Sequence, residues 1–413
     1  MSRPLLFGVT VSPMSSNMPF GFGVGDSDQP FDMQALGQAL QQFGQMLSNA
    51  PADSGPVAWP MVQEVARASL QSTGDPVVAD AELRAVVAAV QLANHWLDEA
   101  CTFPELTVAP QAWSRAQWFE STLPVWKRIV EPIALQMQGA VPTGLPEEMS
   151  SMLGPMMGMM KQLSAVAFSN QLGTSLAALA REVVSASDIG IPLTEQAVIA
   201  LVPSNGAQFG EGLEVSADDV RLYLALRECA HQRLFAHVPW LRARAIGAIE
   251  AYVAGLHVDQ DRLQDMMQGI DMSNPEALQE LMTSGLMTPE DTEEQRAALA
   301  RLETLLAVVE GWVDDVVSEA TKERLPAAGA LRETMRRRRA AGGPAEKAFS
   351  SLVDLELRPR SLREAATLFA AVRSNGGIQA RDALWGHPDL LPDAQDLTDP
   401  LGFIERSKDE PMD

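Results

Sequence analysis

One stretch in the middle of the chain, SADDVRLYLALRECAHQRLFAHVPW over residues 216–240, has the pattern of a long buried helix. Ser216, with Asp219 three residues later, forms a typical helix start, because a serine at this position accepts a hydrogen bond from a backbone N–H of the first turn. One helical face carries Val or Leu at positions 220, 224, 234 and 238. Arg227 and His231 share that face, so we expect both to point into the core.

A guanidinium buried in a core needs an acidic partner, because an unpaired buried charge is very costly. A second predicted helix offers one. Its apolar row, with Leu or Val at positions 302, 306, 313 and 317, is interrupted by Glu310, and Asp314 follows one turn later. We therefore expect Arg227 to face Glu310 and Asp314. If the residues do no more than this, they form a structural ion-pair network, with His231 as a core residue.

The RECAH sequence that begins at Arg227 differs at one position from the H-E-x-x-H pattern of zincin-type zinc peptidases. In that pattern two histidines bind the metal from one helical face, and the glutamate acts as the general base. Glu228 would then be the catalytic base and His231 a metal ligand. Glu310, in an E-x-x-x-D element, would be the third ligand of a gluzincin-type site, and Asp314 would support a histidine ligand.

The chain resembles the second zincin-like family of uncharacterised, mainly actinobacterial proteins, which are labelled hydrolases or zinc-dependent metalloproteases. The resemblance rests on the segments LRECAHQRLFAHVPWLR (226–242), LLAVVEGWVDDVV (305–317), LELRPRSLREAATLFAAV (355–372) and LWGHPDLLPDAQDLTDPLGFI (384–404). It implies a mainly α, zincin-like fold and zinc-dependent hydrolysis. It also implies the roles given above for Glu228, His231 and Glu310.

Arg227 makes this a degenerate HExxH site. Catalytic zinc usually has three protein ligands and a water, and His231 and Glu310 supply two. A permanently charged guanidinium would stand about where the dication belongs and would donate hydrogen bonds to Glu310. Two hypotheses follow: a metal-dependent hydrolase with an unidentified further ligand, or a non-catalytic scaffold or peptide-binding protein (a pseudoenzyme). In the second, an ion pair of Arg227 with Glu310 and Asp314 locks the cleft.

Two other residues have ligand-like spacing from His231. His237 lies six residues later, as in metzincins, but Leu234 stands where that class needs a glycine to break the helix. Glu250 lies close to a short gluzincin spacing but lacks the following acid. We therefore rank both below Glu310.

The sequence predicts four regions. Residues 1–30 are rich in Gly, Pro, Ser and Met and are expected to form a flexible leader. Residues 31–187 form a helical N-terminal region, with helical spacing in segments 32–48, 59–71, 80–100 and 114–138. Residues 188–325 form the zincin-like core, and residues 326–413 form a C-terminal helical region and tail.

A small β hairpin is expected beside the motif helix. Gln196–Val202 (QAVIALV) has the length of a strand, and Gly and Pro residues followed by Leu213–Val215 complete the pattern. Two other segments are left with two interpretations each. The methionine-rich residues 149–160 form either an adaptable helix or loop that packs on the protein's own core, or a groove for a membrane or a partner. The arginine run Arg336–Arg339 either pairs with the acidic body at a helix C-terminus or binds an acidic peptide or polyphosphate.

The composition narrows the possible partners. With 54 acidic and 31 basic side chains the formal charge is −23, which argues against broad nucleic-acid binding and against an acidic lipid surface. The two cysteines cannot build a disulfide framework, and no apolar stretch is long enough to span a membrane. We expect a cytoplasmic protein whose partner is a peptide or another protein.

Overall fold

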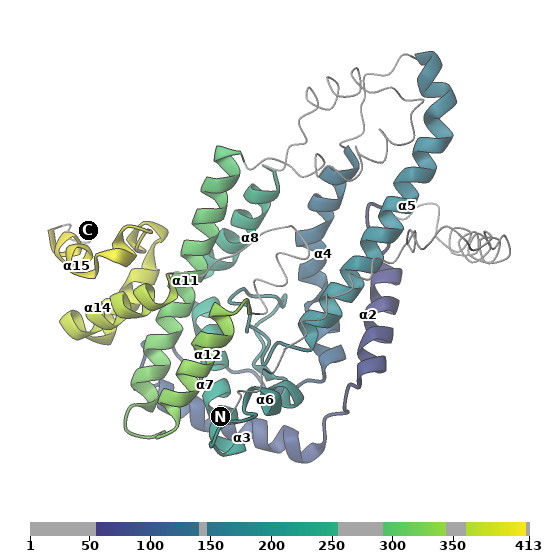
Figure 1. The fold of residues 1–413 in the computed structure, drawn as a ribbon. Coiled ribbons are helices and arrows are strands. Elements are labelled where there is room, and N and C mark those ends of the chain that lie inside the picture. The colour runs from purple at the N-terminus through teal and green to yellow at the C-terminus, as the bar shows by residue number, and fades with distance from the viewer. Residues whose placement is uncertain (1–54, 140–146, 255–291, 344–360, 410–413) are drawn as a thin grey trace, which may run out of the picture. The chain divides into compact units, whose positions relative to one another are not determined.

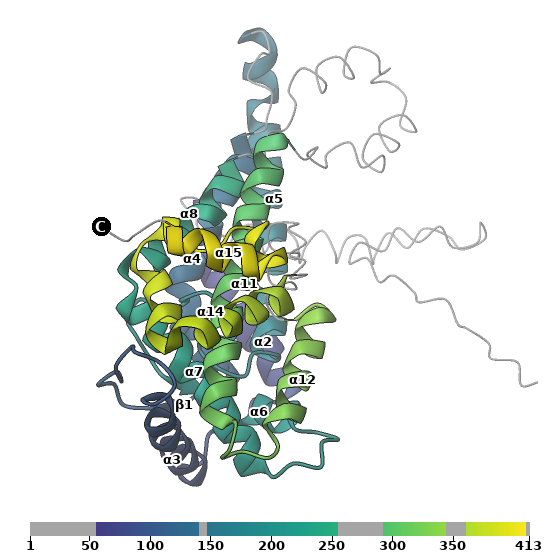
Figure 2. The same cartoon turned by 90° about the vertical axis from the view of Figure 1, so that its left-hand side faces the viewer.

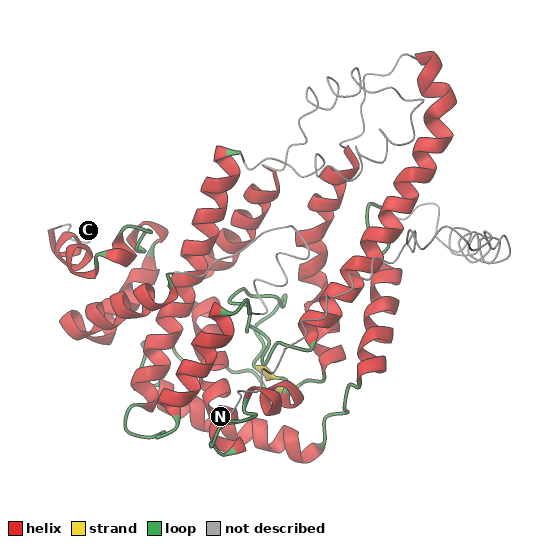
Figure 3. Cartoon of the chain, viewed as in Figure 1, coloured by secondary structure: helices red, strands yellow, loops and turns green. Residues whose placement is uncertain are grey.

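The computed structural model describes residues 55–139, 147–254, 292–343 and 361–409. Residues Gly55–Asp413 form one compact unit, and the described residues within it are mainly helical (Figure 3). The predicted mainly α fold is therefore confirmed. The expected leader at 1–30 and the expected helix at 32–48 lie outside the described residues, and the four-region division stays a prediction. Among the helices described here, none is long and apolar enough to cross a membrane.

The N-terminal helices follow the apolar spacing of the sequence. They are α2 (Trp59–Thr73), α3 (Asp80–Leu97), α4 (Arg115–Gly139) and α5 (Glu147–Ala180). Helix α5 packs against α2 and α4 (Figure 1), and Trp118 and Trp126 fill the core at this contact. The methionine-rich residues 149–160 are helical and belong to α5, and both interpretations of this segment stay predictions.

The motif helix α7 (Ala217–His237) begins as its sequence predicts. The Ser216 side chain accepts a hydrogen bond from the backbone N–H of Asp219 at 3.1 Å. Every residue from Leu222 to Leu234 is buried, because α7 packs against α3, against α8 (Pro239–Ala254) and against α11 (Glu293–Thr321). The polar motif residues therefore lie inside the protein and not on its surface.

Helix α11 starts at a capping box in which Thr292 and Gln295 satisfy each other's backbone N–H groups. Further along α11, Gly311 is in close contact with α14 (Leu362–Ala383). A Cβ atom there would lie 2.5 Å from Cβ of Ala365, so only glycine allows this approach. The packing against α14 fixes the face of α11 that carries Glu310.

The predicted β hairpin is wrong. The strand β2 (Ala200–Leu201) pairs in parallel with β1 (Gln111–Ala112), and Gln111 lies opposite Ala200. The residues after β2 form a short helix, α6 (Pro203–Phe209), because a proline in the first turn favours a helix start. Leu213–Val215 is not a strand. The small sheet does lie beside α7, as expected.

Near the C-terminus, α12 (Ala328–Ala340) contacts both α7 and α11 (Figures 1 and 2). Leu331 and Met335 are its buried apolar residues. The remaining contacts of its inner face come from arginines, which reach the site described below. The chain then continues through α14, three short 3₁₀ turns and α15 (Pro400–Asp409).

Candidate functional site

Glu310 lies at the centre of a buried cluster of three basic side chains. Its Oε2 lies 2.5 Å from Nη2 of Arg227, and its Oε1 lies 2.9 Å from Nε2 of His231 and 2.8 Å from Nη2 of Arg339. Burial alone would raise the pKa of Glu310, but the charges of Arg339, His231 and Arg227 hold this pKa well below its usual range. The Glu310 carboxylate is therefore ionised and engaged at both oxygens.

Arg227 and His231 reach Glu310 from successive turns of α7. Nδ1 of His231 lies 2.9 Å from the backbone oxygen of Arg227, so this nitrogen donates its hydrogen to the carbonyl and Nε2 is directed at Glu310. The same posture is typical of metal-binding histidines, whose other nitrogen is held by a carbonyl or carboxylate. Here, however, Nε2 faces a carboxylate oxygen directly. Arg227, His231 and Glu310, which the sequence predicted to lie together, are therefore in contact in the structure.

Glu228 is fully buried and uses both carboxylate oxygens. Its Oε2 accepts hydrogen bonds from the hydroxyl of Ser187 at 2.5 Å and from the backbone N–H of Ser187 at 3.1 Å, and its Oε1 accepts one from Gln232 at 3.0 Å. Burial raises the pKa of Glu228, and the hydrogen bonds from Ser187 only partly offset this. Ser187 precedes the motif helix and belongs to no recognisable sequence motif, so its role was not predictable from the sequence.

Asp314 lies one turn after Glu310 on α11, but it has different partners. Arg332 binds it through Nε and Nη2, at 2.9 Å and 2.5 Å, and Nη2 of Arg336 lies 2.8 Å away. Burial would raise the pKa of Asp314, but these arginines bring it below its usual value. Asp314 is hydrogen-bonded to arginines of α12, while Arg227 adds only a longer-range attraction. Asp314 therefore links α11 to α12.

Three of the four arginines in the run of α12 make ion pairs with acidic residues of the protein interior. Arg336 binds Asp314 and Arg339 binds Glu310, while Nη1 of Arg338 lies 2.9 Å from Oδ2 of the buried Asp188. Arg337 is the exposed member, 3.7 Å from Glu333. These contacts fit the ion-pairing interpretation of the run. The spacing of Arg332, Arg336 and Arg339, at i, i+4 and i+7, could have revealed this inner face from sequence.

The alternative ligands lie elsewhere. Nε2 of His237 lies 3.1 Å from the backbone oxygen of Pro104, and its ring stacks on Phe103. Glu250 is exposed on α8. Within the described parts of the chain, no group of three or more His, Cys, Asp or Glu side chains is arranged to hold a metal ion.

The donor set around Glu310 does not fit a zinc ion. A zinc ligand must direct a lone pair at the metal, and a guanidinium has none to offer. Arg227 occupies the first ligand position of the motif. Its Nη2 is in contact with Glu310, which occupies the third ligand position. The nearby Arg339 adds a second positive charge on the same carboxylate. A dication at this point would meet two fixed cations.

The buried helical motif and the E-x-x-x-D element define a class of protein: this chain belongs to the family of zincin-like metallopeptidases, whose model matches residues 57–404. Among solved structures, the chain is similar to a candidate hydrolase with a novel fold from Chloroflexus aurantiacus. The two are 19% identical, with a TM-score of 0.61, and the match covers 86% of this chain and 99% of the other. At this identity the likeness shows the fold alone. No functionally curated protein matches the chain.

Acid is expected to weaken the contribution of Glu310 to stability. Because the pKa of Glu310 is lower in the folded chain than in the unfolded one, this contribution is complete above about pH 5 and is lost as the pH falls through the folded value. Glu228, whose pKa is raised, acts in the opposite direction, so a difference between variants is the useful quantity. The free energy of unfolding should be higher for wild type than for Glu310→Gln. This difference should be smaller at about pH 3 than at about pH 7. An equal difference at both would contradict this account.

Proposed function

We propose that this zincin-like protein works without a catalytic zinc ion, as a scaffold or peptide-binding protein. The observation that carries the proposal is the Arg227–Glu310 contact at 2.5 Å, which pairs a guanidinium with the carboxylate at the third ligand position. Arg227 and Arg339 supply to Glu310 the positive charge that a metal supplies in an active zincin. A zinc ion could enter only by breaking these buried ion pairs, which is strongly unfavourable.

Burial of the motif supports the same conclusion. The exposed fractions of Arg227, Glu228, His231 and Glu310 are 5%, 0%, 1% and 4%. General-base catalysis requires the base to lie within hydrogen-bond reach of the attacking water, directly or through one further water. Glu228 is instead enclosed by Ser187 and Gln232, and a peptide bond has no access to it in this arrangement. The motif residues therefore stabilise the core and do not act on a substrate.

A metal-dependent hydrolase is the second candidate, and one observation favours it. Glu228 and His231 keep the positions of base and ligand, and the backbone carbonyl of Arg227 orients the His231 ring as in a metal site. For this candidate to hold, the Arg227 side chain must turn away from Glu310 and another ligand must replace it. The family itself is that of metallopeptidases.

A peptide-cleavage assay separates the two candidates. The protein is incubated with a library of fluorescence-quenched peptides in the presence of zinc, with and without the chelator 1,10-phenanthroline, beside a Glu228→Gln variant. We expect no cleavage that the chelator suppresses. Cleavage that is lost both with chelator and in Glu228→Gln would overturn the scaffold proposal and establish the hydrolase.

A further inference from the structure

Helix α12 is attached to the Glu310 site mainly through charged side chains. Of its 13 residues, two are buried, Leu331 and Met335. Four of its arginines each pair with an acid of the core: Arg332 and Arg336 with Asp314, Arg338 with Asp188, and Arg339 with Glu310. Helix α14, which packs on the same helix α11, buries five apolar side chains. Because most helices are held in place by an apolar face, the attachment of α12 is unusual.

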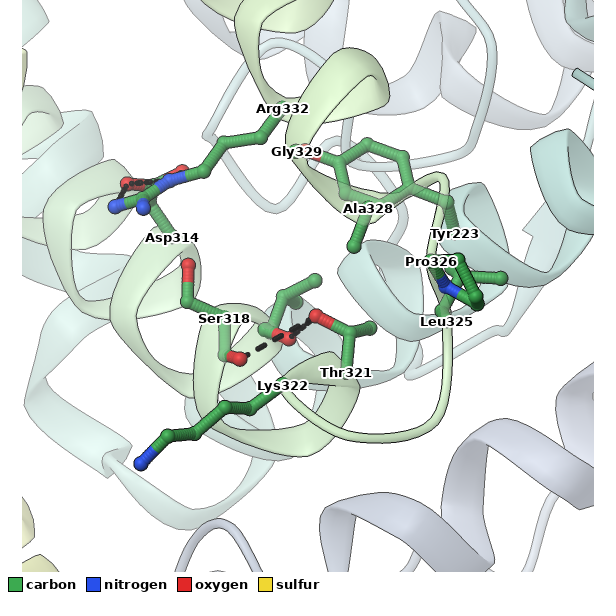
Figure 4. Close-up of a pocket in the computed structure, with 11 residues that line it drawn as sticks. Tyr223, Asp314, Ser318, Thr321, Lys322, Leu325, Pro326, Ala328, Gly329 and Arg332 are labelled. Atoms are coloured by element: carbon green, nitrogen blue, oxygen red, sulfur yellow. Dashed lines mark hydrogen bonds and ion pairs between the residues drawn. The ribbon is translucent and has the colours of Figure 1, made fainter.

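The packing beneath the first turns of α12 is incomplete. A pocket of about 250 Å³ lies there, lined by Gly329 of α12, Tyr223 of α7 and Ser318 of α11 among others. Figure 4 shows Arg332 extending from α12 to Asp314 at one side of this pocket. Protein interiors are normally close-packed, and each missing contact is a loss of dispersion attraction. This part of α12 therefore has fewer apolar contacts to the core than a close-packed helix.

The arginines of α12 lie between the buried acids and solvent. The exposed fractions of the Arg338 and Arg339 side chains are 20% and 12%, and those of Asp188 and Glu310 beneath them are 2% and 4%. Figure 2 shows α12 at the edge of the compact unit, next to α7. Displacement of α12 would therefore open the Glu310 carboxylate to water while α7 and α11 stayed in place.

A second segment, residues 183–194, lies on the same site and is held by the same helix. This segment is irregular, and every residue of it is buried. Buried backbone groups need hydrogen-bond partners, and Arg339 of α12 donates to the carbonyl oxygen of Asp188 at 2.9 Å. Gly190 lies directly against Glu310, because a Cβ atom there would be 3.2 Å from Oε1 of Glu310. The segment and α12 are therefore linked to each other and to Glu310.

We propose that α12 and segment 183–194 form a cover over the Glu310 site that opens as one unit, without unfolding of the core. In the open state Glu310 keeps Arg227, loses Arg339 and becomes accessible to a partner. Local openings of this kind involve segments with few buried apolar contacts. Salt favours the opening because it screens charges that separate, and the four paired arginine side chains of α12 are between 12% and 34% exposed. The cover goes beyond the proposed function and does not depend on whether the site binds zinc.

Hydrogen–deuterium exchange of the full chain, followed by mass spectrometry in about 0.05 M and about 1 M KCl, tests the proposal. A released α12 loses its protection, because an isolated helix of 13 residues is marginal in water. We expect the protection factors of residues 328–340 and 183–194 to fall together by about tenfold or more in high salt, and those of residues 362–372 in α14 to stay within about twofold. Unchanged protection of 328–340, or a fall there without one in 183–194, would overturn the proposal. An equal fall in 362–372 would show unfolding of the core and would overturn it as well.

Two neighbouring arginines of α12 offer a matched pair of variants. Arg338→Gln removes the ion pair with the buried Asp188, whereas Arg337→Gln makes the same change at an exposed side chain that lies 3.7 Å from Glu333 of its own helix. At low salt we expect Arg338→Gln to lower the protection of 328–340 and 183–194 by about tenfold or more, and Arg337→Gln to leave it within about twofold. Equal protection in the two variants, or a loss in Arg338→Gln that is as large in 362–372, would contradict a cover that opens locally.

Discussion

Glu310→Gln is expected to lower the free energy of unfolding by about 3–5 kcal/mol. The change keeps the shape of the side chain but removes the negative charge that Arg227 and Arg339 share in the core. Two buried guanidinium groups would then repel each other without a counter-charge. Denaturant unfolding of the purified variant, followed by circular dichroism, measures the loss.

Glu294→Gln is the matched control for this experiment. It makes the same chemical change on the same helix, but Glu294 is exposed, and surface substitutions of this kind usually change stability by about 0.5 kcal/mol or less. If Glu310→Gln lowered the free energy of unfolding no more than this control does, the ion pairs of Glu310 would not stabilise the fold. The account of the site would then be wrong.

The second large effect is a gain of zinc binding in the double variant Arg227→His, Arg339→Gln. The first change introduces an imidazole at the missing ligand position, and the second removes the other guanidinium from Glu310. Together with His231 and Glu310, this gives the three protein ligands that catalytic zinc usually has. We expect zinc affinity to exceed that of wild type by about 100-fold or more, measured by competition with a chromophoric chelator.

The single variant Arg227→His and the triple variant with His231→Ala complete this series. Arg339 still binds Glu310 in the single variant, so we expect it to gain less affinity than the double. The triple variant lacks one of the proposed ligands and should lose most of the gain. A double variant that binds zinc no better than wild type would show that the three positions do not converge on a metal site.

The helical fold and the centre of the site were predictable because both follow from helical periodicity. The apolar stripe of α7 placed Arg227 and His231 in the core, and the interrupted row of α11 placed Glu310 opposite them. The cost of an unpaired buried charge then required their contact. Burial and spacing were sufficient here because each residue lies on a long, regular helix.

Other parts of the structure depend on contacts between distant segments. Gln196–Val202 has the composition of a strand, but its partner is Gln111–Ala112, far earlier in the chain, and no local turn signal indicates this pairing. The hydroxyl of Ser187 finds Glu228 only through the folded core. The inward contacts of the α12 arginines were harder to predict from the sequence. A run of four arginines is usual at a solvent-exposed helix end, and it is also compatible with a helix end whose arginines pair with buried carboxylates.

The central claim is that Arg227 has taken the place of the metal, and metal content tests it most directly. The untagged wild-type protein is dialysed against zinc, freed of unbound metal and analysed by inductively coupled plasma mass spectrometry, beside the double variant. The account predicts far less than one zinc per wild-type chain and close to one in the double variant. Near-stoichiometric zinc in the wild type, lost on His231→Ala, would contradict it.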